Sequence, residues 1–186
     1  MTSIDSFANS EVEKLQLENI CRKLTKNIKS DSGKLIHNNK EVINLCSNDY
    51  FALATHPSLK KAAIAAIEQD GLGATASRLL TGNHPYYEKL EQKISKYKNT
   101  QKTIIFGSGY LTAIGVIPAL VDRKDVIIAD KNIHASLLDA ARLSRAKILR
   151  FKHNSLESCK KILAENRKKY NKCLIISETV FSMDGD

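Results

Sequence analysis

The sequence predicts an α/β fold in which a mostly parallel sheet carries helices on both faces. Short apolar runs rich in β-branched residues recur through the second half of the chain, and helical patterns separate them. Strands that are apolar along their whole length are typical of parallel sheets, because crossover helices cover both faces. Aromatic residues make up only 6% of the chain and Trp is absent, so short aliphatic side chains must fill the interior.

The first segment, residues 1–56, is expected to form a helix and a hairpin ahead of the large α/β domain at residues 57–186. Apolar side chains recur on roughly one side over residues 11–29, which predicts a helix. Residues 34–45 alternate between polar and apolar side chains. The Asn-Asn pair at their centre predicts a hairpin turn.

Two helices that begin with proline are expected next. Pro57 opens a helix whose apolar residues follow the spacing of one helical face, and Gly71 ends it as a left-handed cap. A loop rich in small residues runs on to Gly82. Pro85 then starts the second helix.

The rest of the chain alternates between strands and helices. Strands are predicted at residues 103–106, 125–129, 147–151 and 173–177. Helices are predicted at residues 110–121 and 134–143. A further helix is predicted after Asn154, because Glu157 follows it at the spacing of a capping box, and Leu156 is expected on its buried side.

The charge and cysteine content favour an ordinary reduced protein. Lys and Arg number 29 against 20 Asp and Glu, but they are scattered over the predicted helix faces with acids between them. This pattern indicates a solvated surface, and a nucleic-acid binder is the weakest reading. The 4 cysteines include no CxxC pair, so we expect no metal site and a cytoplasmic location. The start of the chain shows no signal peptide, and the longest apolar stretch is too short to span a membrane.

Polar or glycine-containing loops follow several predicted strands, where open parallel sheets bind ligands. Residues 107–110, Gly-Ser-Gly-Tyr, lead from a strand directly into a helix. Unpaired N–H groups at a helix start attract anions, and glycine lets a phosphate approach the backbone. Glycine needed only for the geometry of the turn is the alternative. The loop matches neither GxGxxG nor a Walker sequence, so a dinucleotide fits poorly.

Two further loops carry candidate site residues. His134 lies at a helix start just beyond a strand, where it could serve a ligand or simply cap the helix. Glu178 and Ser182 follow the last strand, and ordinary hydrogen bonding within the loop is their alternative role.

Taken in order, the loop motifs resemble those of the α-oxoamine synthases, a pyridoxal-phosphate family of the aspartate-aminotransferase fold (fold type I). The resemblance runs from about Arg22 to Asp186. The matching stretches are Ser47-Asn48-Asp49-Tyr50, Ser77-Arg78-Leu79-Leu80-Thr81-Gly82-Asn83-His84-Pro85, Gly109-Tyr110, His134-Ala135-Ser136 and Phe181-Ser182-Met183-Asp184-Gly185-Asp186.

The resemblance implies which residues would contact pyridoxal 5'-phosphate. Gly109 and Tyr110 would lie at the phosphate, and His134 would stack on the pyridine ring. Ser182 would hydrogen-bond near the cofactor. Glu178 would hold residues that contact the cofactor without contacting it directly. His134 is thereby the one catalytic candidate within the chain.

The resemblance also implies substrate contacts and a homodimer. Arg22 would bind the carboxylate of the acyl substrate, because a forked guanidinium suits a carboxylate, and Asn48 would lie on the amino-acid side. The loop over residues 71–82 would approach the cofactor of a partner subunit.

The sequence departs from the family's pattern in two places. Ala113 stands where the family often has Asn, and residues 73–76 hold less glycine than usual. The family's Asp-x-x-His motif and its Schiff-base lysine would lie downstream of residue 186. We therefore expect a truncated first part of the fold that is inactive by itself.

The stretch from Ser77 to Pro85 most resembles the branch of the family that joins L-alanine to a pimeloyl thioester, of CoA or of a carrier protein, in biotin synthesis. The branches that make 5-aminolevulinate and 2-amino-3-ketobutyrate share most of these motifs and remain alternatives. A dimerisation module that keeps the fold without the chemistry is another alternative.

Overall fold

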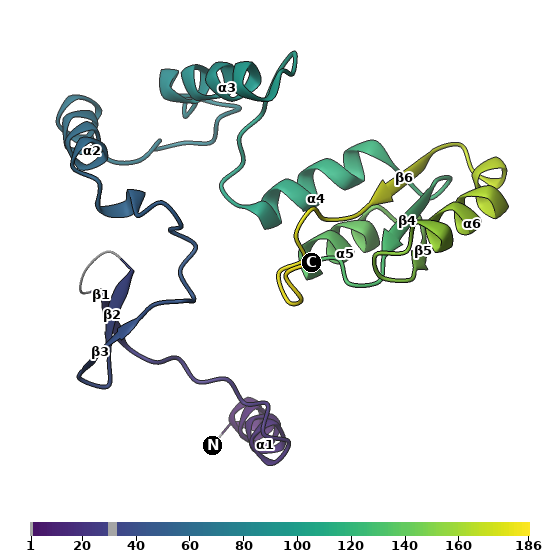
Figure 1. Ribbon diagram of the computed structural model, residues 1–186, viewed down its shortest axis with the longest axis horizontal. Coiled ribbons are helices and arrows are strands. Elements are labelled where there is room, and N and C mark those ends of the chain that lie inside the picture. Colours follow the sequence, from purple (N-terminus) through teal and green to yellow (C-terminus); the bar gives the residue numbers. More distant parts are fainter. Residues whose placement is uncertain (1, 30–32) are drawn as a thin grey trace. The chain divides into compact units, whose positions relative to one another are not determined.

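Figure 1 shows the computed structural model of the chain, which describes residues 2–29 and 33–186. The chain divides into two compact units, Met1–Gly73 and Ala74–Asp186. The first unit carries a helix, a small antiparallel sheet and a second helix, and the second unit carries the parallel sheet. The functional division expected at residue 56 stays a prediction.

Helix α1 (Ser3–Leu17) begins and ends earlier than predicted. The Thr2 hydroxyl accepts a hydrogen bond from the Asp5 N–H, while the Asp5 carboxylate accepts one from the Thr2 N–H. This reciprocal capping box starts the helix. Asn19 has a φ of 57°, which turns the chain out of the helix. The predicted helix over residues 11–29 is therefore wrong at both ends, and Arg22 lies beyond the helix.

The predicted hairpin is confirmed. Asn38 and Asn39 have φ angles of 49° and 60°, as a type I′ turn requires, and they place His37 opposite Lys40. A third strand pairs antiparallel on the other side, giving a sheet in the order β1-β2-β3. The strands are β1 (Asn27–Lys29), β2 (Lys34–His37) and β3 (Lys40–Ile43).

Replacing Asn39 with glycine is expected to stabilise this hairpin by about 0.5 kcal/mol, because glycine reaches a positive φ without the steric cost of a side chain. Amide hydrogen exchange in β2 and β3 would report the change as slower exchange. Lys40→Gly is the matched control: it weakens a strand position and should speed exchange. Faster exchange in the Asn39→Gly variant would contradict the prediction.

Helix α2 (Pro57–Asp70) forms as predicted, with Pro57 in its first turn and His56 as its cap. It follows the short 3-10 helix η1 (Leu53–Thr55). Gly71 ends it with a φ of 76° and a ψ of -161°, which lies outside the left-handed helical region, so the predicted left-handed cap is wrong. No residue at positions 2–28 and 33–73 is buried. The core of the described chain therefore lies in the second unit.

Helix α3 (Pro85–Lys98) is joined to the loop before it by Arg78. The Arg78 guanidinium donates hydrogen bonds to Glu91 Oε1 at 2.7 Å and to Asn83 Oδ1 at 2.9 Å. The guanidinium carbon also lies 4.3 Å from the centre of the Tyr87 ring. These contacts fix the loop on α3, because a guanidinium offers several donors in a rigid plane.

Residues 103–106 form no strand, which corrects the prediction. The Ile105 N–H donates to Glu91 Oε1 at 2.9 Å, and its carbonyl oxygen accepts from Arg78 at 3.3 Å. The side chains of Arg78 and Glu91 thus take up the backbone hydrogen-bonding groups of Ile105. Among the described residues, no strand pairs with this segment to do so.

The second unit contains the predicted parallel sheet. Strand β4 is central, pairs in parallel with β5 and β6, and is buried over its whole length. The strands are β4 (Val126–Asp130), β5 (Lys147–Phe151) and β6 (Cys173–Ile176). Buried Asp125 joins the amino ends of β4 and β6, because its carboxylate accepts hydrogen bonds from the backbone N–H groups of Asp122 and Lys172.

Helices cover both faces of this sheet, as predicted (Figure 1). Ile127 and Ala129 face α4 and α5, while Val126 and Ile128 face Cys159 of α6. The helices are α4 (Gly109–Leu120), α5 (Ala135–Leu143) and α6 (Leu156–Asn166), and the 3-10 helix η2 (Arg167–Lys169) follows α6.

The predicted cap of α6 is one residue out of place. Ser155 caps the helix, with its hydroxyl accepting from the Ser158 N–H, whereas Asn154 has a φ of 51°. Asn154 does not cap the helix, because its backbone is left-handed and its N–H and side-chain amide are bonded to Asp130 and Asp186. Leu156 is 67% exposed rather than on the buried side.

The cysteines at positions 21, 46, 159 and 173 are free. Among the helices in residues 2–29 and 33–186, none has both the length and the apolar character to cross a membrane.

Candidate functional site

His134 and Glu178 meet at the carboxyl ends of β4 and β6. The His134 backbone N–H donates to Glu178 Oε1 at 2.5 Å. His134 caps α5, because its Nδ1 accepts from the Ser136 N–H at 3.1 Å and lies 2.7 Å from the Ser136 hydroxyl. In the neutral ring this acceptor role at Nδ1 leaves the proton on Nε2. His134 is an exposed residue, so a ligand can reach its side chain.

The amino terminus of α4 is open to an anion. Ser108 caps the helix, with its hydroxyl accepting from the Leu111 N–H at 3.1 Å. Gly109 is the first helical residue, and a Cβ placed there would meet no heavy atom within 4 Å. Tyr110 is 50% exposed. The first N–H groups of a helix have no partner within it, so this end can bind a phosphate.

The other predicted site residues are exposed. Ser182 lies in the loop after β6, in the same unit as His134 and Glu178. Arg22 and Asn48 belong to the first unit. The roles expected for these three side chains stay predictions.

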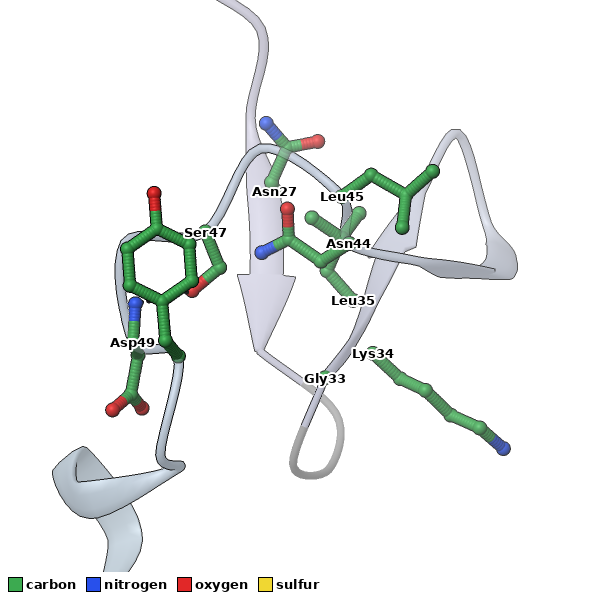
Figure 2. Close-up of a pocket in the computed structure, with 9 residues that line it drawn as sticks. Asn27, Gly33, Lys34, Leu35, Asn44, Leu45, Ser47 and Asp49 are labelled. Atoms are coloured by element: carbon green, nitrogen blue, oxygen red, sulfur yellow. Dashed lines mark hydrogen bonds between the residues drawn. The ribbon is translucent and has the colours of Figure 1, made fainter. Parts of the chain in front are cut away.

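A cavity of about 570 Å³ lies in the first unit, between the hairpin and the loop that follows it (Figure 2). Asn48 does not line it, although both of its neighbours do. The Asp49 N–H donates to the Ser47 hydroxyl at 3.1 Å, which folds the loop against this cavity. The lining residues are Asn27, Gly33, Lys34, Leu35, Asn44, Leu45, Ser47, Asp49 and Tyr50.

Sequence reasoning missed a polar cluster at the carboxyl end of the sheet, centred on Asp130. This side chain is fully buried at the end of β4. Its carboxylate accepts hydrogen bonds from the N–H groups of Asn132 at 2.7 Å and Asn154 at 2.9 Å. His153 Nδ1 lies 2.9 Å from the same carboxylate. The only signal in the sequence is an acid at a strand end, followed by His-Asn after the next strand.

The cluster continues into the loop after β6. His153 Nε2 lies 3.1 Å from Asp186 Oδ2, and the Asn154 side-chain amide donates to the same oxygen at 2.6 Å. The His153 ring also meets the Phe181 ring edge-on, with 4.5 Å between their centres. A carboxylate thus faces each nitrogen of the imidazole.

Electrostatics favour the charged form of both partners. The hydrogen bond to Asp130, supported by the one to Asp186, raises the pKa of His153 above its ordinary value of 6.5. Burial disfavours the ionised form of Asp130, but the hydrogen bonds from Asn132, His153 and Asn154 outweigh it and hold the pKa of this carboxyl below its ordinary 3.8.

The family model of aminotransferase class I and II matches residues 40–186. The chain belongs to this family. It is 46% identical over 181 residues to an 8-amino-7-oxononanoate synthase of Thermoanaerobacter pseudethanolicus, and the match covers 97% of the chain and 46% of that relative. A synthase of the same name from Beijerinckia indica is 41% identical over 186 residues, with 100% and 48% covered. The chain thus spans about half the length of the curated relatives it matches.

Solved structures agree with this assignment. A serine palmitoyltransferase of Sphingomonas wittichii is 29% identical, has a TM-score of 0.86, and is matched over 100% of the chain and 47% of its own length. An 8-amino-7-oxononanoate synthase of Francisella tularensis is 30% identical with a TM-score of 0.61, over 75% and 38%. The predicted relation to the α-oxoamine synthases and the fold type I architecture are confirmed. Enzymes of this family depend on pyridoxal phosphate, as one serine palmitoyltransferase structure with the cofactor illustrates.

Proposed function

We propose that this chain supplies the phosphate-binding and ring-binding part of the site of a pyridoxal-phosphate acyltransferase. The single observation that carries the proposal is the contact between His134 and Glu178, which joins the ends of two strands beneath an exposed imidazole. The open amino terminus of α4 fits the phosphate of the same cofactor.

Each described residue then has a distinct task. The N–H groups of Gly109 and Tyr110 would hold the phosphate, and the His134 ring would contact the pyridine. Glu178 fixes the backbone of His134, so that the imidazole keeps its orientation. Bound pyridoxal phosphate supplies the electron sink that lets an amino acid lose its α-proton. Turnover also requires a Schiff-base lysine and an acid at the pyridine nitrogen, and the family resemblance assigns neither role to a residue named here.

The substrates we propose are L-alanine and pimeloyl-CoA, or the pimeloyl carrier-protein thioester, which condense to 8-amino-7-oxononanoate with release of CO2 and of the thiol of CoA or the carrier protein. The names of the curated relatives support this choice. Arg22 would bind the carboxylate of the acyl chain, and Asn48 would lie near the amino acid. A homodimer in the cytoplasm completes the proposal, and the free cysteines fit a reducing compartment.

The proposal is tested by the affinity for pyridoxine phosphate, which has no aldehyde and therefore does not react with surface lysines. Equilibrium dialysis should show binding of pyridoxine phosphate and much weaker binding of pyridoxine, because only the former carries the phosphate. Equal affinity for both compounds, or no binding of either, would overturn the proposal.

The Gly109→Ala variant locates the phosphate. An added methyl group meets no protein atom there, and alanine favours helix, so stability should stay equal or rise. The affinity for pyridoxine phosphate should nevertheless fall about threefold, because the methyl group keeps the phosphate from the backbone. Unchanged affinity would place the phosphate elsewhere.

A further inference from the structure

The loop after β6 is folded into a closed turn. The Phe181 N–H donates to the Asp186 carbonyl oxygen at 3.0 Å, and the Gly185 N–H donates to the Phe181 carbonyl oxygen at 2.7 Å. Gly185 has a φ of 75°, which favours glycine at this position. Phe181 is only 2% exposed and anchors the turn in the core. Ser182 therefore lies directly beside a fixed point of the loop.

The two aspartates near the end of this turn accept hydrogen bonds from side chains that follow strands β4 and β5. Asp186 accepts hydrogen bonds from the side chains of His153 and Asn154, which follow β5. Asp184 accepts from the Asn132 side chain at 3.3 Å, which follows β4. The outer strand β5 and the middle strand β4 thus both fix a loop that follows the third strand.

His153 makes the most contacts to this loop. Its Nδ1 bonds to buried Asp130, its Nε2 bonds to Asp186, and its ring edge packs on Phe181. One side chain therefore touches the loop at both ends and connects it to the buried end of β4. The ionisable groups that face it are Asp130 from β4, and Asp184 and Asp186 from the loop, with Asp184 Oδ2 at 4.0 Å.

We propose that His153 is a positioning residue, which holds the loop from Phe181 to Asp186 closed by bridging Asp130 and Asp186 and so sets the place of Ser182 beside the cofactor. The part that concerns the cofactor rests on the proposed function. The bridge requires a proton on both imidazole nitrogens, since a carboxylate can only accept hydrogen bonds. A neutral amide cannot replace it, because one amide group cannot donate in two opposite directions at the ring's spacing.

The test compares the full chain with its His153→Gln variant by amide hydrogen exchange, in buffers that contain EDTA so that no stray cation bridges the carboxylates. Exchange of the Gly185 and Phe181 amides should speed up about tenfold, while Ile128 in the middle of β4 reports global opening and should change less. His37→Gln is the matched control, because that imidazole lies in the hairpin of the first unit. Unchanged exchange at Gly185 and Phe181 would overturn the proposal.

Further measurements separate positioning from a merely structural role. In the unmodified chain, the protection of the Gly185 amide, which is its exchange rate relative to that of an unstructured amide at the same pH, should fall as the pH rises and His153 loses its proton. In His153→Gln this protection should no longer depend on pH. The affinity for pyridoxine phosphate should fall with the same pH profile. A looser loop with unchanged affinity would overturn the positioning role. If the unmodified chain binds no pyridoxine phosphate, the proposed function fails, while the exchange rates still decide whether His153 closes the loop.

Discussion

Replacing Asp130 with alanine is expected to lower the free energy of unfolding of the second unit by about 3–5 kcal/mol. Asp130 is fully buried, and its carboxylate accepts hydrogen bonds from Asn132, His153 and Asn154. Its removal leaves two backbone N–H groups and a charged imidazole without their acceptor. The cost of these unmet donors exceeds the loss of a typical surface ion pair.

Urea denaturation followed by circular dichroism measures this loss. Asp139→Ala is the matched control, because Asp139 is exposed and its ion pair with Arg142 spans 3.4 Å on one face of α5. That change should alter stability by less than about 0.5 kcal/mol. Asp130→Asn should fall between the two, since the amide keeps one acceptor oxygen. Equal losses in Asp130→Ala and Asp139→Ala would show that the cluster contributes nothing special.

The same cluster should make stability depend on pH in a defined direction. The raised pKa of His153 means that its contribution is complete below the unfolded value of about 6.5 and is lost as the pH rises through the folded value. The lowered pKa of Asp130 means that its contribution is present above about 3.8 and is lost as the pH falls through the folded value. Stability from this pair should therefore be largest between those two ordinary values, and His153→Gln should remove the decline on the alkaline side.

Local patterns in the sequence predicted most of the second unit. The spacing of apolar residues gave β4, β5 and β6 and the helices that cover them, because each pattern depends only on which side chains are buried within one element. The hairpin turn at Asn38 and Asn39 was found for the same reason, since a type I′ turn is decided by two neighbouring residues.

The failures have a common physical cause, which is that distant or competing partners decide the structure. Residues 103–106 have the composition of a strand, yet Arg78 and Glu91 bond to Ile105 in place of a neighbouring strand. Asn154 has the spacing of a helix cap, yet its backbone is left-handed and it donates hydrogen bonds to Asp130 and Asp186. No local pattern reveals such bonds, because the partners are 14 residues apart in the Glu91–Ile105 pair, 24 in the Asp130–Asn154 pair and 27 in the Arg78–Ile105 pair.

The candidate site shows the same division. Gly109, His134 and Glu178 were each identified singly, from strand ends and from the resemblance to a family. The hydrogen bond between His134 and Glu178 crosses 44 residues and could be found only in the structure. His153 had no role in the family resemblance, and its place after a strand was its only sequence signal, so its contacts with Asp130, Phe181 and Asp186 were needed to reveal it.

His134 has two separable roles, and a pair of substitutions should divide them. His134→Asn keeps a side chain that can cap α5 but removes the aromatic ring, so stability should be unchanged while the affinity for pyridoxine phosphate falls about tenfold. His134→Phe keeps the ring but removes the acceptor for the Ser136 N–H. Its affinity should stay within about threefold, while its free energy of unfolding should fall by about 1 kcal/mol.

The two variants are expected to have opposite effects: one loses affinity and keeps stability, and the other loses stability and keeps affinity. Capping requires an acceptor atom within reach of the Ser136 N–H, whereas stacking requires a flat ring on the exposed side, and each variant preserves only one of these properties. Equilibrium dialysis gives the affinities, and urea denaturation gives the stabilities. If asparagine binds pyridoxine phosphate as well as histidine does, the imidazole only caps α5, and the ligand lies away from its face.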